Sequence, residues 1–485
     1  MGSRMMKLLK LAAGLILTGA LLFLGMRIYV SQRGAPLEAW HTFAPQELTA
    51  EEIDRADWDQ YLVAENAVFE QVRTEVTQRL DADERVPANR YFEGSPVYPG
   101  RFAVDWNRSF VLEPPGDPVG AAIFLHGLTD SPYSMRNIAR LYQERGFLAV
   151  VPRLPGHGTV PAGLAEAEWQ DWAAAARLAA REARRRVGPG RPIHVIGYSN
   201  GGAVAMKYAL DAIDDPNLPH PDRIVLISPM IGITEWARFA GLAGLPAVLP
   251  AFAKSAWLSV LPEFNPFKYN SFPVNAARQS SLLTRALQPR IARFAREGRL
   301  LDMPPVLTFQ SLTDFTVSTQ AVVDALYSQL PANGSELVLF DLNRSTKFGP
   351  LLRPSTETLL SRLFPEAPRP YRTTIVTNAG PDSAEVVARV TEAGAATEEV
   401  RPLGLDYPKE VFSLSHIALP FPVTDPLYGL APDPSEDFGV HLGSMALRGE
   451  RGTLITSLDA LNRMASNPFF SYLLERIAEG IPAGR

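Results

Sequence analysis

The segment with the strongest chemical signal is Gly197-Tyr198-Ser199-Asn200-Gly201-Gly202, which lies between an apolar stretch at 192–197 and a helical stretch from about residue 201. Glycines on both sides of a serine are typical of a sharp strand-to-helix turn, where bulky neighbours would collide. Such a turn raises the hydroxyl above the sheet and places the next N–H at a helix N-terminus, where it can stabilise an oxyanion. The pattern predicts that Ser199 is a nucleophile for acyl transfer, with a purely structural turn as the alternative.

An earlier apolar stretch ends in a second motif, Leu125-His126-Gly127-Leu128. In acyl-transfer enzymes the loop after such a strand supplies a second oxyanion donor through a backbone N–H. We therefore expect the N–H groups of Leu128 and Asn200 to form an oxyanion hole. A third motif, Pro155-Gly156-His157-Gly158, places a histidine between glycines in an early loop. This position favours a structural turn over a catalytic base.

In this order and spacing the three motifs resemble the α/β-hydrolase fold family, especially its bacterial carboxylesterase and monoacylglycerol-lipase-like branch. The resemblance is close over residues 121–228 and looser elsewhere. It implies a serine nucleophile, an Asp or Glu after a later strand, and a histidine last in the chain. It also implies that neither a metal ion nor an organic cofactor is needed.

The acid expected from this order is Asp314, which follows the apolar stretch 305–311 and precedes Val317 by three residues, as in the family's acid loop. Its carboxylate would accept the imidazole N–H and stabilise the imidazolium. Asp341, at the end of the apolar stretch 336–341, is the reserve candidate, whereas Asp302 lies before the strand.

The base expected from this order is His416, because only His416 and His441 among the seven histidines follow the acid. His416 is expected to end a short apolar strand, and His441 is the alternative. Acid and base are 102 residues apart (416 − 314), whereas one helix and one strand need only about 30 residues. We expect an insertion here, with an extra αβ unit at 355–377 followed by a polar stretch through 400. The long interval keeps Asp341 open as the acid.

The elements that must position these residues follow a βαβ rhythm from residue 119 onward, which predicts a mostly parallel sheet with helices on both faces. Strands are expected at 121–126, 147–152, 192–197, 223–228, 305–311, 336–341 and 373–377, and helices near 134–145, 165–186, 201–213 and 455–479. The apolar stretch 231–303 breaks the rhythm and predicts a helical lid between the core halves 119–230 and 304–485. Its aromatic residues indicate either a lipophilic substrate or core packing: Trp236, Phe239, Trp257, Phe264 and Phe267.

The N-terminal segment 1–30 contains sixteen uncharged residues, 11–26, with three basic residues before them and Arg27 after them. With Arg27 snorkelling, residues 28–30 extend the apolar run to a membrane-spanning length. We expect an uncleaved transmembrane anchor with a cytoplasmic N-terminus and an extracytoplasmic, periplasmic body. A cleaved signal peptide, leaving a secreted protein, and a buried helix are the alternatives. Residues 31–118 are expected to form an N-terminal extension, with one helix from about Thr49 to Leu80.

The composition narrows the function classes further. The 485-residue chain is 46% hydrophobic and carries a net charge of −5, so it should fold and is a poor nucleic-acid binder. The absence of cysteine excludes a thiolate nucleophile and Cys-ligated metals. We therefore expect a serine hydrolase acting on lipophilic carboxylic esters. The alternatives are a thioesterase, an amidase or an acyltransferase on the same fold, or a non-catalytic membrane-anchored binding protein.

Overall fold

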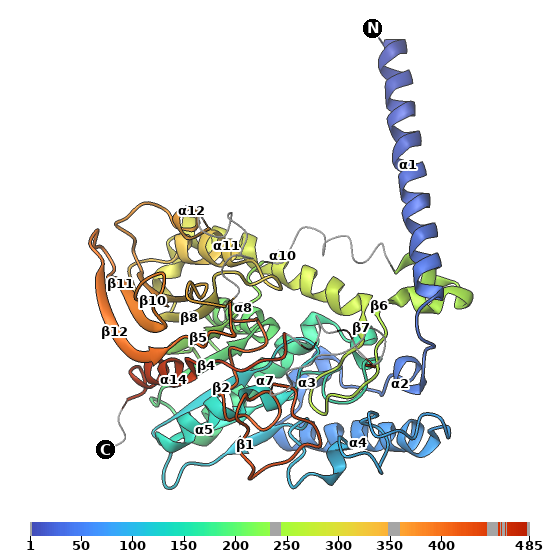
Figure 1. Cartoon of the computed structure of the whole chain (residues 1–485), viewed down its shortest axis with the longest axis horizontal. Coiled ribbons are helices and arrows are strands. Elements are labelled where there is room, and N and C mark those ends of the chain that lie inside the picture. The colour runs from blue at the N-terminus through green and yellow to red at the C-terminus, as the bar shows by residue number, and fades with distance from the viewer. Residues whose placement is uncertain are drawn as a thin grey trace.

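One mixed sheet forms the centre of the molecule (Figure 1). The computed structural model describes residues 2–232, 244–347, 359–443, 454–455, 457, 461 and 463–482. Within them the strands lie in the order β1-β3-β2-β4-β5-β8-β9-β10-β11-β12. The run from β3 to β10 is parallel, while β1, β11 and β12 pair antiparallel with their neighbours. Their bounds are β1 Phe110–Leu112, β2 Gly120–Leu125, β3 Phe147–Val151, β4 Ile193–Tyr198, β5 Arg223–Ile227, β8 Val306–Ser311, β9 Glu336–Phe340, β10 Arg372–Asn378, β11 Glu385–Thr391 and β12 Glu399–Asp406.

Helices cover both faces of this sheet, as the βαβ rhythm predicts. Side chains alternate along each strand: Ile123 of β2 joins a core with α7 (Trp169–Val187), α8 (Asn200–Asp214) and α10 (Val274–Arg296). The next residue, Phe124, joins the opposite core with α5 (Arg136–Glu144) and α14 (Phe470–Ala478). The remaining short elements are α6 Gly163–Glu166, α11 Thr319–Ala321, α12 Leu359–Leu363, η2 Pro99–Arg101, η3 Pro132–Met135, η7 Arg299–Asp302, η8 Val322–Leu326 and η9 Tyr327–Gln329.

The N-terminal extension contains several helices in place of the single helix expected over Thr49–Leu80. They are α2 Ala39–Thr42, α3 Ala50–Arg55, α4 Trp58–Glu75 and η1 Thr77–Arg79. The expected helix is interrupted because Asp57 caps a new helix, accepting the Gln60 N–H in a reciprocal capping box. Ile53, Trp58 and Tyr61 are buried in the same core as the sheet, so the extension packs against the body.

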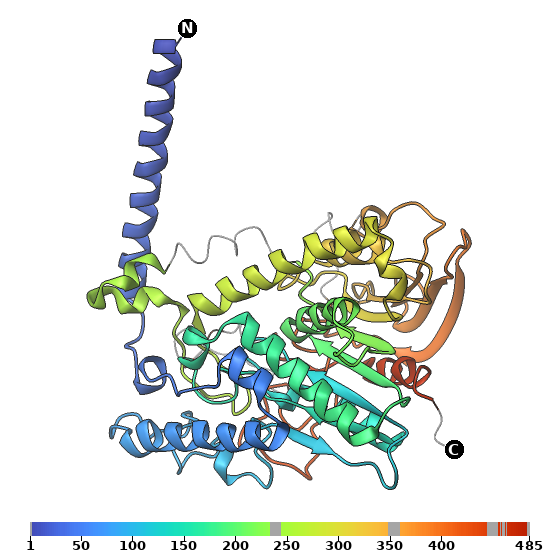
Figure 2. The same ribbon diagram turned by 180° about the vertical axis from the view of Figure 1, so that it is seen from behind.

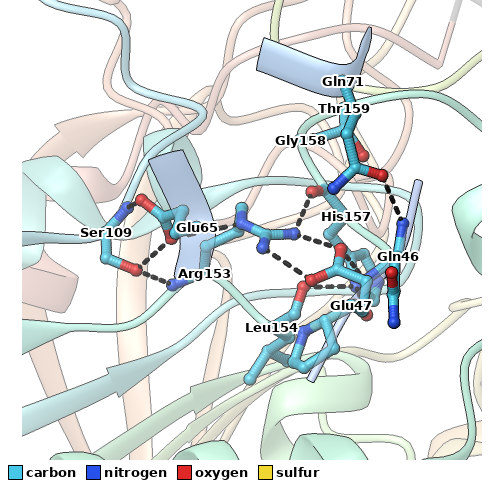
Figure 3. Close-up of polar contacts among 12 residues, drawn as sticks. Gln46, Glu47, Glu65, Gln71, Ser109, Arg153, Leu154, His157, Gly158 and Thr159 are labelled. Atoms are coloured by element: carbon cyan, nitrogen blue, oxygen red, sulfur yellow. Dashed lines mark hydrogen bonds and ion pairs between the residues drawn. The ribbon is translucent and has the colours of Figure 1, made fainter. Parts of the chain in front are cut away.

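A buried ion cluster ties this extension to the loop after β3 (Figure 3). The Arg153 guanidinium donates to both carboxylate oxygens of Glu47 (2.7 and 2.8 Å) and to Glu65 (3.2 Å). Although burial alone would lower it, the two carboxylates raise the pKa of Arg153. Arg153 also donates to the His157 carbonyl at 3.0 Å, so the glycine-rich turn 155–158 is held by the extension.

The segment expected as a lid, 231–303, contains more than short helices. It includes η5 (Leu245–Val248), η6 (Pro250–Ala256), a hairpin of β6 (Trp257–Ser259) and β7 (Phe272–Pro273), and the long helix α10. Trp236 and Phe239 lie outside the described residues. Trp257, Phe264 and Phe267 are buried, and Phe267 stacks on Tyr133 with ring centroids 4.2 Å apart. These three aromatic side chains therefore pack in the protein interior.

The insertion between acid and base enlarges the sheet. Strand β10 occurs at the expected position, and the polar stretch that follows it contributes the antiparallel pair β11–β12, which was not among the expected strands. The two ends of the insertion are joined by hydrogen bonds. The Asn343 backbone N–H donates to Phe412 O (2.9 Å), and the Asn343 side chain donates to Pro408 O and Val411 O (2.9 and 2.8 Å). The final helix expected at 455–479 is shorter than predicted: within the described residues it is α14, and residues 463–469 before it are not helical.

Helix α1 (Gly2–Gln32) rises from one edge of the body (Figures 1 and 2). Residues Met5–Gln32 are long and apolar enough to cross a membrane, and such a helix near the N-terminus is also compatible with a signal sequence. The Arg27 guanidinium donates to Trp257 O at 2.9 Å and Ser255 O at 3.4 Å. The Arg27 side chain is therefore bound by the body, whereas we expected it to snorkel to the bilayer surface.

Candidate active site

The turn between β4 and α8 holds Ser199 in a strained backbone conformation. Its φ is 54° and its ψ is −115°, a region that non-glycine residues rarely adopt. A Cβ on Gly197 would lie 2.4 Å from Gly201 O, and one on Gly201 would lie 2.0 Å from Leu125 O. Only glycine fits at these two positions. The Ser199 N–H donates to Ile227 O at 2.9 Å, which fixes the turn against the end of β5.

Three side chains expected to act together lie in one hydrogen-bonded chain. Ser199 Oγ is 2.8 Å from His416 Nε2, and His416 Nδ1 is 2.8 Å from Asp314 Oδ2. An ionised carboxylate only accepts, so Nδ1 carries the proton and Nε2 is left to accept the Ser199 hydroxyl. Ser199 and His416 are buried, and the Asp314 side chain is fully so. The arrangement can move a proton from the hydroxyl to the imidazole.

The surroundings of Asp314 favour its charged form. Burial alone would raise the pKa of this carboxyl, but the His416 imidazole and hydrogen bonds to the carboxylate lower it on balance. Its Oδ1 accepts the backbone N–H groups of Thr316 (2.8 Å) and Val317 (3.1 Å), and its Oδ2 accepts the Gln310 side chain at 3.2 Å. Sequence reasoning missed Gln310; a buried polar residue in the apolar strand β8, four positions before the acid, was the available signal.

The position of His416 follows from the closure of the insertion. Asn343 joins the end of β9 to residues 408–412, a few residues before His416. The strand expected to end at His416 does not form, because residues 411–416 have no strand pairing. Asp341, the reserve acid, contacts neither Ser199 nor His416. Its carboxylate accepts Leu342 N–H (2.7 Å), Thr377 Oγ1 (2.9 Å) and Arg344 (3.5 Å), which gives it a structural role at the start of the excursion.

The expected oxyanion donors lie at the ends of β2 and β4. Asn200 is the first residue of α8, and Leu128 precedes Thr129, whose φ is 62°. Within the described part of the chain, neither backbone N–H has a hydrogen-bond acceptor. Both are therefore available to an incoming oxygen. The partly buried Lys268, which sequence reasoning missed, donates to Thr129 Oγ1 at 3.0 Å and contacts Leu128 O at 3.5 Å; desolvation lowers its pKa.

With this geometry in place, comparisons with known proteins identify the fold. Residues 121–316 match the family model described as the alpha/beta hydrolase fold. The chain has the α/β-hydrolase fold. It is 27% identical over 222 residues to a thermostable monoacylglycerol lipase of Bacillus sp. (strain H-257), covering 46% of this chain and 80% of that protein.

Solved structures with similarity to this α/β-hydrolase include metagenome-derived lipolytic enzymes of the LipS and LipT study (21% identity, TM-score 0.39, 49% of this chain and 89% of that chain). Another is a soluble variant of monoglyceride lipase from Saccharomyces cerevisiae (13% identity, TM-score 0.37, 48% and 81%). The family match ends at residue 316, so it includes Ser199 and Asp314, whereas α1, the extension, β9–β12 and His416 lie outside it.

The other histidines of this α/β-hydrolase have partners away from Ser199. His157 Nδ1 lies 3.1 Å from Pro155 O, as expected for a structural turn, and the His126 Nε2 accepts the Leu154 N–H at 3.0 Å. His441, the alternative base, lies 2.8 Å from Pro426 O through Nδ1. Among the described residues, no group of three or more His, Asp or Glu side chains could hold a metal ion.

Proposed function

We propose that this protein is a serine hydrolase that cleaves carboxylic esters through an acyl-enzyme. The observation that carries the proposal is the Ser199–His416–Asp314 chain, with 2.8 Å at each link. His416 accepts the Ser199 proton as the oxygen attacks the ester carbonyl, and Asp314 stabilises the imidazolium. The Leu128 and Asn200 N–H groups hold the oxyanion. His416 then protonates the leaving alcohol, and water activated by the same imidazole releases the acid.

Lipophilic acyl esters are the substrate class we propose. The relative named as a monoacylglycerol lipase supports it, and so does an apolar helix able to place the body at a bilayer. We propose that α1 remains as an anchor, with the body on the extracytoplasmic side because the basic residues precede the span. Signal cleavage and release is the alternative outcome.

A substrate panel tests this proposal. The full chain is assayed in detergent on short- and medium-chain p-nitrophenyl esters, a monoacylglycerol, and matched thioester and amide substrates. The proposal expects ester hydrolysis that Ser199→Ala abolishes. Preference for the thioester or amide, or transfer to an added alcohol, would replace the esterase assignment by that reaction. A folded wild-type protein without activity on any substrate would favour the binding-protein alternative.

A further inference from the structure

Helix α1 is fixed to the body by polar contacts at its base. Besides the Arg27 contacts with Ser255 and Trp257, Ser31 Oγ lies 3.1 Å from Ser255 Oγ and Gln32 donates to Ala251 O at 2.9 Å. All these partners belong to η6 or the start of β6. Because several hydrogen bonds join the two parts, a span fixed in a bilayer also fixes which side of the body faces that bilayer.

The helix that lies along this side is α10. In both views α10 runs from the region of η6 along the upper edge of the body, the edge from which α1 rises, while α4 lies along the opposite, lower edge (Figures 1 and 2). Between α10 and the sheet lies α8, held by Arg290 to Asp211 and Asp214. The face of α10 turned away from α8 is therefore an outer surface of the molecule.

That outer face carries a row of arginines, Arg278, Arg285 and Arg296, all exposed. Successive helix residues are about 100° apart, so these three positions lie within about 20° of one another around the axis. Arg290, which binds α8, lies about 120–140° away by the same count. Within the described residues, none of the three arginines has a carboxylate within ion-pair distance.

Charge is distributed unevenly between the two edges. Residues 274–299 contain six arginines and one carboxylate, Glu297, whereas residues 49–84, which include α3 and α4, contain eleven carboxylates and three arginines. The edge near α1 is thus basic and the opposite edge acidic, in a chain whose net charge is −5. A basic row beside a membrane span is complementary to anionic phosphate headgroups.

We propose that the Arg278–Arg285–Arg296 row of α10 docks on anionic phospholipid headgroups of the bilayer that α1 spans. The body then lies with α10 toward the lipid and the acidic extension toward the aqueous phase. Each arginine contributes about fivefold to the docking equilibrium, since a basic side chain near such a surface is worth about 1 kcal/mol. This inference rests on the proposed membrane span of α1 and is independent of the proposed ester hydrolysis.

The absence of cysteine in the chain makes a direct test possible. Ala292→Cys, on α10, and Val63→Cys, an exposed site on α4, each give a single position for a fluorophore. The labelled full chain is reconstituted into vesicles of phosphatidylcholine alone or mixed with phosphatidylglycerol, with nitroxide-headgroup lipid as quencher. We expect phosphatidylglycerol to increase quenching at position 292 but not at 63, and high salt to remove the increase.

Two triple variants distinguish the effect of this arginine row from the effect of the net charge of the protein. We expect the triple variant Arg278→Gln/Arg285→Gln/Arg296→Gln to lose the phosphatidylglycerol-dependent quenching at position 292, and the matched triple variant Arg55→Gln/Arg73→Gln/Arg79→Gln in the extension to keep it. Equal quenching with and without phosphatidylglycerol, equal loss in both triple variants, or quenching at position 63 instead would overturn the proposal. If the chain fails to float with the vesicles, α1 does not anchor it and the docking proposal is overturned, whatever the activity of the protein on esters.

Discussion

At the scale of single residues, the two candidate acids differ in what their carboxylates bind. The Asp314 carboxylate accepts a hydrogen bond from the Nδ1–H of His416. The Asp341 carboxylate accepts hydrogen bonds from its own loop and from Thr377 of β10. Sequence order favoured Asp314, but the 102-residue interval kept Asp341 open, because strand pairing across an insertion cannot be read from the chain. The contacts of the two side chains favour Asp314 as the acid.

Replacing each acid by its amide separates these roles. We expect Asp314→Asn to lower kcat on p-nitrophenyl esters by about 10³–10⁴-fold, because an amide cannot hold the Nδ1-protonated imidazole or stabilise its cation. Asp341→Asn is the matched control and should change kcat by less than about tenfold, since a lost structural hydrogen bond costs about 1 kcal/mol. The reverse ranking would move the acid to Asp341.

Buried histidines make stability depend on pH. Burial lowers the pKa of His194 to about 3, so the folded protein keeps it neutral while the unfolded chain protonates it below its ordinary value of about 6.5. Stability present above pH 6.5 is therefore lost as the pH falls toward 3, by about 2 kcal/mol for this one group at about pH 5. His194→Gln should make the decrease in unfolding free energy between about pH 7 and pH 5 shallower by that amount. Urea unfolding at pH 7 and pH 5 measures this difference, and an equal decrease in unfolding free energy for the wild type and His194→Gln would contradict it.

At the scale of elements, the strands from β2 to β5, β8, β9 and β10 were predictable, because each is an apolar run between polar turns. The hairpin β11–β12 was not, because every residue of β12 is exposed or partly exposed and its sequence lacks an apolar pattern. The division of the N-terminal helix at Asp57 is also a local effect, in which a capping box overrides a continuing helical pattern. Closure of the insertion by Asn343 is a long-range contact and leaves no local signal.

Asn343 should therefore affect catalysis through the segment that carries His416. We expect Asn343→Ala to lower the unfolding free energy by about 1 kcal/mol, since it removes the side-chain donor from the carbonyls of the partly buried Pro408 and Val411, and to lower kcat more than it changes KM. Asn333→Ala removes a comparable contact, to Met303 O, far along the chain from His416. If the two variants reduced kcat equally, Asn343 would be a stability residue only.

The Arg153 cluster is expected to join the extension to the core energetically. Arg153→Met leaves the Glu47 and Glu65 carboxylates without their cation, and breaking a buried pair costs about 3–5 kcal/mol. Arg177→Met, which breaks the partly exposed pair with Asp54, should cost less than about 1 kcal/mol. Urea unfolding of the two variants measures both values. Similar small losses would show that the extension contributes little to stability.

At the scale of the whole molecule, the proposed membrane anchor depends on α1 remaining attached to the body. From Lys7 to Arg27 the helix rises about 30 Å at 1.5 Å per residue, which matches the hydrocarbon thickness of a bilayer. The sequence predicted the apolar run but not its contacts with η6, because those depend on the folded body.

We therefore expect the full-length chain to stay in the membrane pellet after alkaline carbonate extraction, with an intact N-terminus by mass spectrometry. A protease added on the extracytoplasmic side should reach the body. A shortened N-terminus together with release into the soluble fraction would establish a cleaved signal peptide instead.

The most direct test of the central claim is the site at which a fluorophosphonate reacts with the folded full-length protein. We predict one covalent adduct, on the peptide that contains Ser199, absent in Ser199→Ala and formed far more slowly in His416→Ala because the hydroxyl then has no base. No adduct on the folded wild-type protein, or an adduct on another residue, would contradict the assignment of Ser199 as the nucleophile.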